Sequence, residues 1–195
     1  MPSEPAYVTA FKAFIKRGVE EDHFADMTAE FHGQNDRTTI ILAASIVDES
    51  ITDSIRALLR DHGVVRSLFD PDGPLGSFAS RISLGFGLRL FDTKTKHDLD
   101  LIRLLRNGCA HSQIPFRFEM TEIRDVCAHL VLPDLPEFGE VPEDYEQAFP
   151  EISSDMSHPK TRFVSATSTI WTPLSRFAYK INLKPGQSPS LPLLP

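Results

Sequence analysis

The chain has 195 residues, of which 41% are hydrophobic and 24% charged, and this composition predicts a globular protein with one sizeable core. It excludes a wholly disordered chain, a collagen-like fibre and a coiled-coil rod. No apolar run approaches the roughly 18 residues that a membrane span needs, so we expect no membrane association. Its two cysteines make no disulfide framework, which favours a reducing cytoplasm as the location.

The formal net charge of −7 arises largely in one stretch of the sequence. Residues 133–158 contain 8 acidic residues and no Lys or Arg, whereas residues 36–132 contain 13 acidic and 12 basic residues. Proteins that bind duplex DNA use Lys and Arg to displace counterions from phosphate, and they usually show a basic patch. No such patch is visible here, so the sequence disfavours direct DNA binding.

Proline is scarce in the first part of the chain, where only Pro71 and Pro74 occur between Ala6 and Ile114. This scarcity favours helices, because proline lacks the amide donor and clashes with the preceding turn. Apolar residues recur at helical spacing in the first segment, at Tyr7, Phe11, Phe14, Ile15, Val19, Phe24, Met27 and Phe31. We therefore expect a first helical segment here, interrupted near Gly18.

The second predicted helix is the most regular and extends from Asp36 to about Asp61, with Asn35 as its cap and Gly63 as its stop. Its apolar stripe consists of Ile40, Ala44, Val47, Ile51, Ile55 and Leu58. The segment DPDGPLG at 70–76 predicts a turn, after which Ser77 caps a third helix. That helix carries Phe78, Ile82, Leu84, Leu88 and Phe91, and its two glycines, Gly85 and Gly87, favour close packing of a neighbouring helix.

We expect Asp98 to open a fourth helix that buries Leu99, Ile102, Leu105 and Cys109 and ends near Pro115. The short segment 116–119 is predicted to be extended. A fifth helix starts at Thr121 and has its core side at Ile123, Val126, Cys127 and Leu130.

The last third of the chain is predicted to combine an acidic segment, a late helix and a tail. The acidic, proline-containing stretch 133–158 resembles a linker on the surface, and residues 161–181 form a helix that Pro173 kinks. The proline-rich tail 183–195 is predicted to be loose. Together the elements predict an all-α protein: a single helical bundle of five to six helices within residues 1–182.

The fourth predicted helix carries a cluster of polar residues, in which Arg103, Asn107 and His111 are spaced four residues apart and so lie along one side. Arg106 is offset, with a side chain long enough to reach the same region. An arginine supplies a forked charge for phosphate, and a histidine transfers protons near neutral pH. One hypothesis is therefore that Arg106 and His111 cleave RNA without a metal. The structural alternative is that Arg106 and Asn107 bond to neighbouring helix ends and His111 caps the helix.

The second helix is flanked by Arg37, Asp48 and Glu49. One hypothesis is a buried polar network with Arg81, Arg103 or Arg106 across the bundle, and the other is a substrate-binding role. Cys-Ala-His occurs at 109–111 and again at 127–129, but this spacing matches no standard zinc finger. We therefore expect buried free cysteines, no metal and no cofactor.

Four segments carry a resemblance to a known family: DRTTIILAASIVDESI, LFDPDGPLGSFASRISLGFGLRLF, DLDLIRLLRNGCAHS and FRFEMTEIRDVCAHL. In order and spacing they resemble the mannitol operon repressor family over residues 36–132, most specifically in GPLGSFASRI and IRLLRNGCAHS. The resemblance implies an all-helical bacterial transcriptional regulator without a helix-turn-helix, which acts through a protein partner or as a homodimer. The matching polar positions are Arg37, Asp48, Glu49, Arg81, Arg103, Arg106, Asn107 and His111.

The hexapeptide from Arg106 to His111 also resembles the RNxxxH signature of HEPN domains, helical bundles that include metal-independent ribonucleases. That resemblance implies RNA as the substrate, catalysis by Arg106 and His111, an orienting role for Asn107, and a site completed by a second subunit. The favoured interpretation is a regulator without enzymatic activity. The alternative is an endoribonuclease.

Overall fold

The computed structural model describes residues 35–59, 62–112, 114–131 and 156–182. Within these ranges the protein is all-helical, as predicted. The six helices described are α3 (Asp36–Leu58), α4 (Gly63–Ser67), α5 (Phe78–Gly87), α6 (Thr93–His111), α7 (Thr121–Ala128) and α9 (Pro159–Asn182). The predicted helix before residue 35, most of the acidic segment 133–158 and the tail from residue 183 lie outside the described residues.

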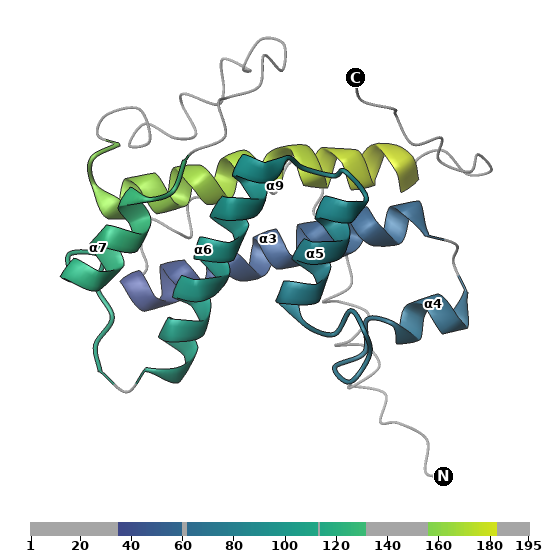
Figure 1. The fold of residues 1–195 in the computed structure, drawn as a ribbon, viewed down its shortest axis with the longest axis horizontal. Helices are drawn as coiled ribbons and strands as arrows, with labels where there is room; N and C mark the ends of the chain where they lie inside the picture. Colours follow the sequence, from purple (N-terminus) through teal and green to yellow (C-terminus); the bar gives the residue numbers. More distant parts are fainter. Residues whose placement is uncertain (1–34, 60–61, 113, 132–155, 183–195) are drawn as a thin grey trace.

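Two long helices, α3 and α9, lie side by side and form the base of the bundle (Figure 1). They are parallel, because Asp36 Oδ1 lies 3.4 Å from Lys160 Nζ near the start of both helices, and Ser50 Oγ lies 3.1 Å from Ser175 Oγ further along both. Helices α5 and α6 cross α3 and contact each other, and α7 packs against α6 and α9 (Figure 1). None of the described helices combines the length and apolarity required to cross a membrane.

The described helices share one hydrophobic core, and the apolar stripes predicted from the sequence supply most of it. Its completely buried large side chains come from α3, α5, α6, α7 with its following turn, α9 and the loop before α7: Ile40, Val47, Ile51, Ile55, Ile82, Leu99, Ile102, Leu130, Phe163, Ile170, Trp171 and Phe118. The Phe118 and Phe163 rings lie 5.6 Å apart between centroids, which joins the loop before α7 to α9.

The predicted caps of α3 and α5 are confirmed. Asn35 Oδ1 accepts a hydrogen bond from the Thr38 amide at 3.1 Å, and Ser77 Oγ accepts one from the Ser80 amide at 3.1 Å. The predicted end of α3 is wrong by a few residues, because the helix ends at Leu58 and Gly63 begins the short α4 rather than following the end of α3.

The predicted start of α6 is also wrong. The helix begins at Thr93, and its cap is Asp92, whose Oδ1 accepts a hydrogen bond from the Thr95 amide at 2.8 Å. Asp98 lies in the second turn and is completely buried, and its Oδ1 accepts a hydrogen bond from the Val131 amide at 2.8 Å. The first turn has only polar residues, Thr-Lys-Thr-Lys, so it adds nothing to the apolar stripe from which the start was predicted.

The extended segment predicted at 116–119 is wrong in its second half, because residues 118–120 turn and lead directly into the helix at Thr121. The turn at 70–76 is present, and its glycines are required by close main-chain packing. A Cβ atom at Gly73 or Gly76 would overlap the carbonyl oxygens of Leu68 or Asp70. Gly85 does pack closely, against Phe91 and Ile51, whereas Gly87 faces open space, contrary to the prediction.

Candidate functional site

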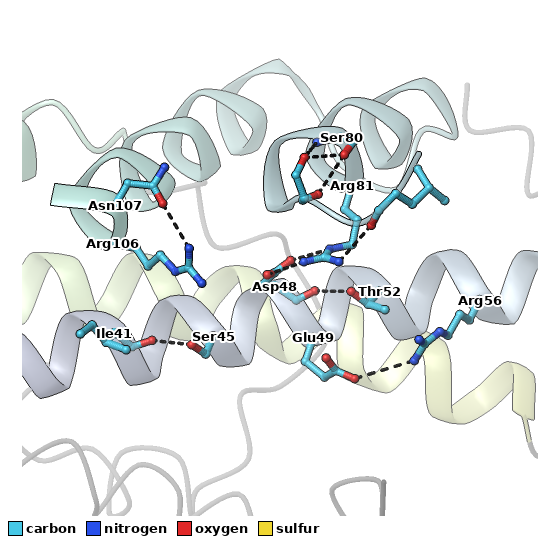
Figure 2. Close-up of polar contacts among 12 residues, drawn as sticks. Ile41, Ser45, Asp48, Glu49, Thr52, Arg56, Ser80, Arg81, Arg106 and Asn107 are labelled. Atoms are coloured by element: carbon cyan, nitrogen blue, oxygen red, sulfur yellow. Dashed lines mark hydrogen bonds and ion pairs between the residues drawn. The ribbon is translucent and has the colours of Figure 1, made fainter. Parts of the chain in front are cut away.

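Four of the polar residues predicted for a site, Asp48, Arg81, Arg106 and Asn107, lie where α5 and α6 cross over α3 (Figure 2). Arg81 on α5 donates from Nε to Asp48 Oδ1 at 2.8 Å and from Nη2 to Asp48 Oδ2 at 2.7 Å (Figure 2). Its Nη1 donates to the Leu75 carbonyl oxygen at 3.0 Å. The two side chains are only 14% and 17% exposed, so this forked pair attaches the start of α5 firmly to the middle of α3.

Arg106 and Asn107 reach the same surface from α6. The Arg106 side chain extends toward α3, on the side from which Arg81 approaches Asp48 (Figure 2). Its Nη1 donates to Asn107 Oδ1 at 3.2 Å, and both side chains are partly buried. The amide of Asn107 therefore orients the guanidinium, but within the described residues this contact joins α6 only to itself.

Two of the predicted site residues pair locally instead of across the bundle. Glu49 lies on the exposed side of α3 and its Oε1 is 3.9 Å from Arg56 Nη1 on the same helix (Figure 2). Arg103 Nη2 lies 3.6 Å from Asp100 Oδ1, one turn earlier on α6. The Arg103 Nε atom is buried and has no hydrogen-bond partner. Of the polar residues predicted for a site, Arg81 and Asp48 are therefore the two that form an ion pair between helices.

The C-terminus of α6 is capped by Arg37, a role that was predicted for His111 as the structural alternative to catalysis. Arg37 Nη1 donates to the carbonyl oxygens of Cys109 at 2.5 Å and Ser112 at 3.1 Å, and Nη2 donates to that of Ile114 at 2.6 Å. A guanidinium at this end also interacts favourably with the helix dipole. Carbonyl oxygens carry no sequence signature, so no pattern in the chain indicated this contact.

Arg106 and His111 are not brought together within one chain. They are five residues apart on α6, which places their side chains roughly 140° apart around the helix. Arg106 extends toward α3, whereas His111 is exposed, and its ring makes no hydrogen bond or ion pair with another described residue. A single subunit therefore presents no joined arginine–histidine site in the part that the structure describes.

Both cysteines are completely buried free thiols, as predicted. Burial raises the pKa of Cys109 to about 11 and that of Cys127 to about 12, so both remain protonated at neutral pH. Among the described residues no group of three or more His, Cys, Asp or Glu side chains is arranged to hold a metal ion.

Comparison with known proteins gives similarity over part of the chain. No protein-family model matches it. The mannitol operon repressors of Escherichia coli strain K12 and of Escherichia coli O6:H1 strain CFT073 are each 29% identical to this chain over 115 residues. The match covers 54% of this chain and 59% of each repressor, so it spans a little over half of those relatives. The resemblance predicted from the sequence segments is confirmed at this level.

A solved structure shares the fold. The chain is similar to a chain in the X-ray structure of the MtlR–HPr complex from Escherichia coli, with a TM-score of 0.50 and 23% sequence identity. The superposed region covers 80% of this chain and 96% of that chain. The all-helical architecture is therefore one that a known protein adopts over nearly its whole length.

Proposed function

We propose that this protein is a transcriptional regulator similar to the mannitol operon repressor, and that it acts by associating with another protein. The observation that carries this proposal is the 29% identity with that repressor over 115 residues. The likeness of fold to a chain of the MtlR–HPr complex supports it and supplies a first partner to test, namely the HPr of the source organism.

The charges of this chain agree with association rather than direct DNA contact. With a net charge of −7, the chain as a whole is repelled by phosphate. Four of the partly buried arginines of the described helices are already engaged: Arg37 with carbonyl oxygens of the α6 terminus, Arg81 with Asp48, Arg103 with Asp100, and Arg162 with the Leu130 carbonyl oxygen. These arginines hold helices and turns in place and are therefore poorly available to phosphate.

Isothermal titration of the full chain with purified HPr tests the proposal. We expect saturable binding with a defined stoichiometry, and a shift of both proteins into one peak in size-exclusion chromatography. Fluorescence anisotropy with operator DNA is the parallel measurement, and we expect no sequence-dependent binding by the protein alone. Absence of any heat of binding to HPr, or tight operator binding without a partner, contradicts the proposal.

The comparisons give the ribonuclease alternative no support, because the relatives found are mannitol operon repressors. One subunit alone holds no joined Arg106–His111 site in the described residues, so this alternative requires a second subunit. Incubation of the protein with mixed RNA in EDTA tests it directly. We expect no cleavage, and the same result for His111→Ala. If the native chain cleaves RNA and His111→Ala abolishes the cleavage, the endoribonuclease hypothesis replaces the regulator hypothesis.

A further inference from the structure

Arg106 differs from the other partly buried arginines of the described residues, which are Arg37, Arg81, Arg103 and Arg162. Each of those four meets a carboxylate or a main-chain carbonyl oxygen. Arg106 meets neither, since its hydrogen bond goes to the side-chain amide of Asn107. Arg103 Nε and Arg162 Nε are buried without a hydrogen-bond partner, whereas no nitrogen of Arg106 is, so the unpartnered donors of Arg106 remain accessible from solvent.

Two donor atoms of this guanidinium, which lie on the edge that can bind both oxygens of a carboxylate, have no partner. Nη1 is held by Asn107, which leaves Nε and Nη2 without a partner among the described residues. The neighbouring Arg81 shows what that edge does in this fold, because Arg81 Nε and Nη2 grip both oxygens of Asp48 at 2.8 and 2.7 Å. The same edge of Arg106 is thus preset for one carboxylate, in the geometry that arginine prefers.

The surroundings leave the charge of Arg106 uncompensated and its surface accessible. Asp48 on α3, drawn in the same view, is already neutralised by Arg81 (Figure 2). Below Arg106, α3 presents Ser45, which is exposed and whose hydroxyl donates to the Ile41 carbonyl oxygen at 2.7 Å. A side chain from another protein therefore meets the small Ser45 and the positive charge of Arg106, and Arg106 is not already paired with an anion.

We propose that Arg106, oriented by Asn107, is the point at which an acidic side chain of a partner protein docks, with its carboxylate on Nε and Nη2 and its main chain above Ser45. This inference rests on the proposed function, since it assigns a contact to the partner-bound state. A lone guanidinium beside a neutralised pair suits one carboxylate of a folded partner. A nucleic acid requires several cationic side chains in a row. Asn107 is a positioning residue in this assignment.

Titration of the full chain with HPr, at low and at high sodium chloride, tests the assignment. We expect Arg106→Ala to weaken binding at least about tenfold and to reduce its salt dependence. Arg106→Lys keeps the charge but not the fork, so we expect an intermediate affinity. The matched control is Arg176→Ala, which removes the same charge from an exposed position on α9 and should change the affinity less than about twofold. Thermal unfolding of each variant verifies folding, and we expect the Tm of Arg106→Ala to stay near that of the native chain.

The outcomes of this experiment distinguish a failure of the docking point from a failure of the proposed function. If the native chain binds HPr and Arg106→Ala binds equally tightly, the docking point is wrong and the proposed function stands. If the native chain does not bind HPr, the association fails and the docking point fails with it. Inorganic phosphate at matched ionic strength is the last arm. Competition by phosphate that Arg106→Ala abolishes would assign the site to a phosphate group and overturn the carboxylate.

Discussion

Asp53 illustrates how neighbouring charges act on one residue. It lies on α3 one turn after Glu49, and Arg56 Nη1 is 3.8 Å from its Oδ1. Burial, followed by repulsion from Glu49, raises the pKa of Asp53 to about 6, and Arg56 offsets this only in part. The folded protein therefore binds the Asp53 proton more tightly than the unfolded chain does, since the ordinary pKa is 3.8.

This shift predicts a pH-dependent effect of Asp53→Asn on stability. The stabilising contribution of the protonated carboxyl is complete below pH 3.8 and is lost as the pH rises through about 6. We expect the Tm of Asp53→Asn, relative to the native chain, to rise between about pH 4 and pH 6 and to level off above. The effect is modest because the side chain is 45% exposed. A Tm difference that does not vary with pH would show that the pKa is ordinary.

The pair formed by Asp48 and Arg81 is the strongest polar contact that the described residues make between α3 and α5. Because the pair is forked and largely shielded, removing one partner leaves the other charge with poor hydration. A double-mutant cycle with Asp48→Ala and Arg81→Ala should give a coupling free energy of about 1.5–3 kcal/mol in urea unfolding. The matched pair is Glu49 with Arg56, exposed and 3.9 Å apart, for which we expect less than about 0.5 kcal/mol. Equal coupling in the two pairs would contradict the role assigned to shielding.

The sequence placed the right residue types near this site but left their partners open. Asp48 and Arg81 are 33 positions apart, and Arg81, Arg103 and Arg106 were equal candidates until the crossing of α5 and α6 over α3 was known. Arg37 was expected to pair with another side chain, but its acceptors are main-chain carbonyl oxygens, which every residue possesses. Partner choice is decided by tertiary geometry, and a residue pattern does not contain it.

At the scale of elements, the sequence predicted helices better than their ends. Asn35 and Ser77 were identified as caps because a clear apolar stripe follows each of them. Asp98 was mistaken for a cap because the true first turn of α6 is entirely polar. The five-residue helix α4 has no buried residue, so no periodic burial could reveal it.

The end of α5 stores conformational strain that a substitution can release. Arg89 has a φ of 58°, in the left-handed region, and the Leu90 amide donates to the Gly85 carbonyl oxygen at 3.0 Å. This is the arrangement in which helices usually place glycine. Arg89→Gly should raise the free energy of unfolding by about 0.5–1 kcal/mol, net of the greater entropy of the unfolded chain.

Urea unfolding monitored by circular dichroism measures this effect. Arg89→Ala is the control, because it removes the exposed side chain but keeps a Cβ atom in the left-handed region. We expect its stability to stay within about 0.5 kcal/mol of the native chain. A gain by Arg89→Ala as large as that of Arg89→Gly would assign the effect to the side chain and not to the backbone.

At the scale of the whole molecule, the helices within residues 36–132 do not form a complete core by themselves. Helix α9 packs along α3 and inserts Phe163, Ile170, Trp171 and Leu174, all at most 4% exposed. Burying such side chains stabilises a protein by about 1.5–3 kcal/mol each, so α9 contributes an amount comparable with the entire stability of a typical domain, about 5–15 kcal/mol. The late helix is therefore as necessary to the fold as the helices within residues 36–132.

We therefore expect a variant truncated after residue 158 to lose cooperative unfolding while keeping part of its helical circular dichroism signal. It should also bind a dye that reports exposed apolar surface. The reason is that α3 then exposes the residues that α9 covers, and Ser50 and Ser54 lose Ser175 and the Leu174 carbonyl oxygen as partners. The control is Tyr179→Ala in the full chain, an exposed position of α9, for which we expect the Tm to change little. A shortened chain that unfolds cooperatively at the Tm of the full chain would show that α3, α5, α6 and α7 form a core without α9, and that the parallel pair of long helices is not the base of this fold.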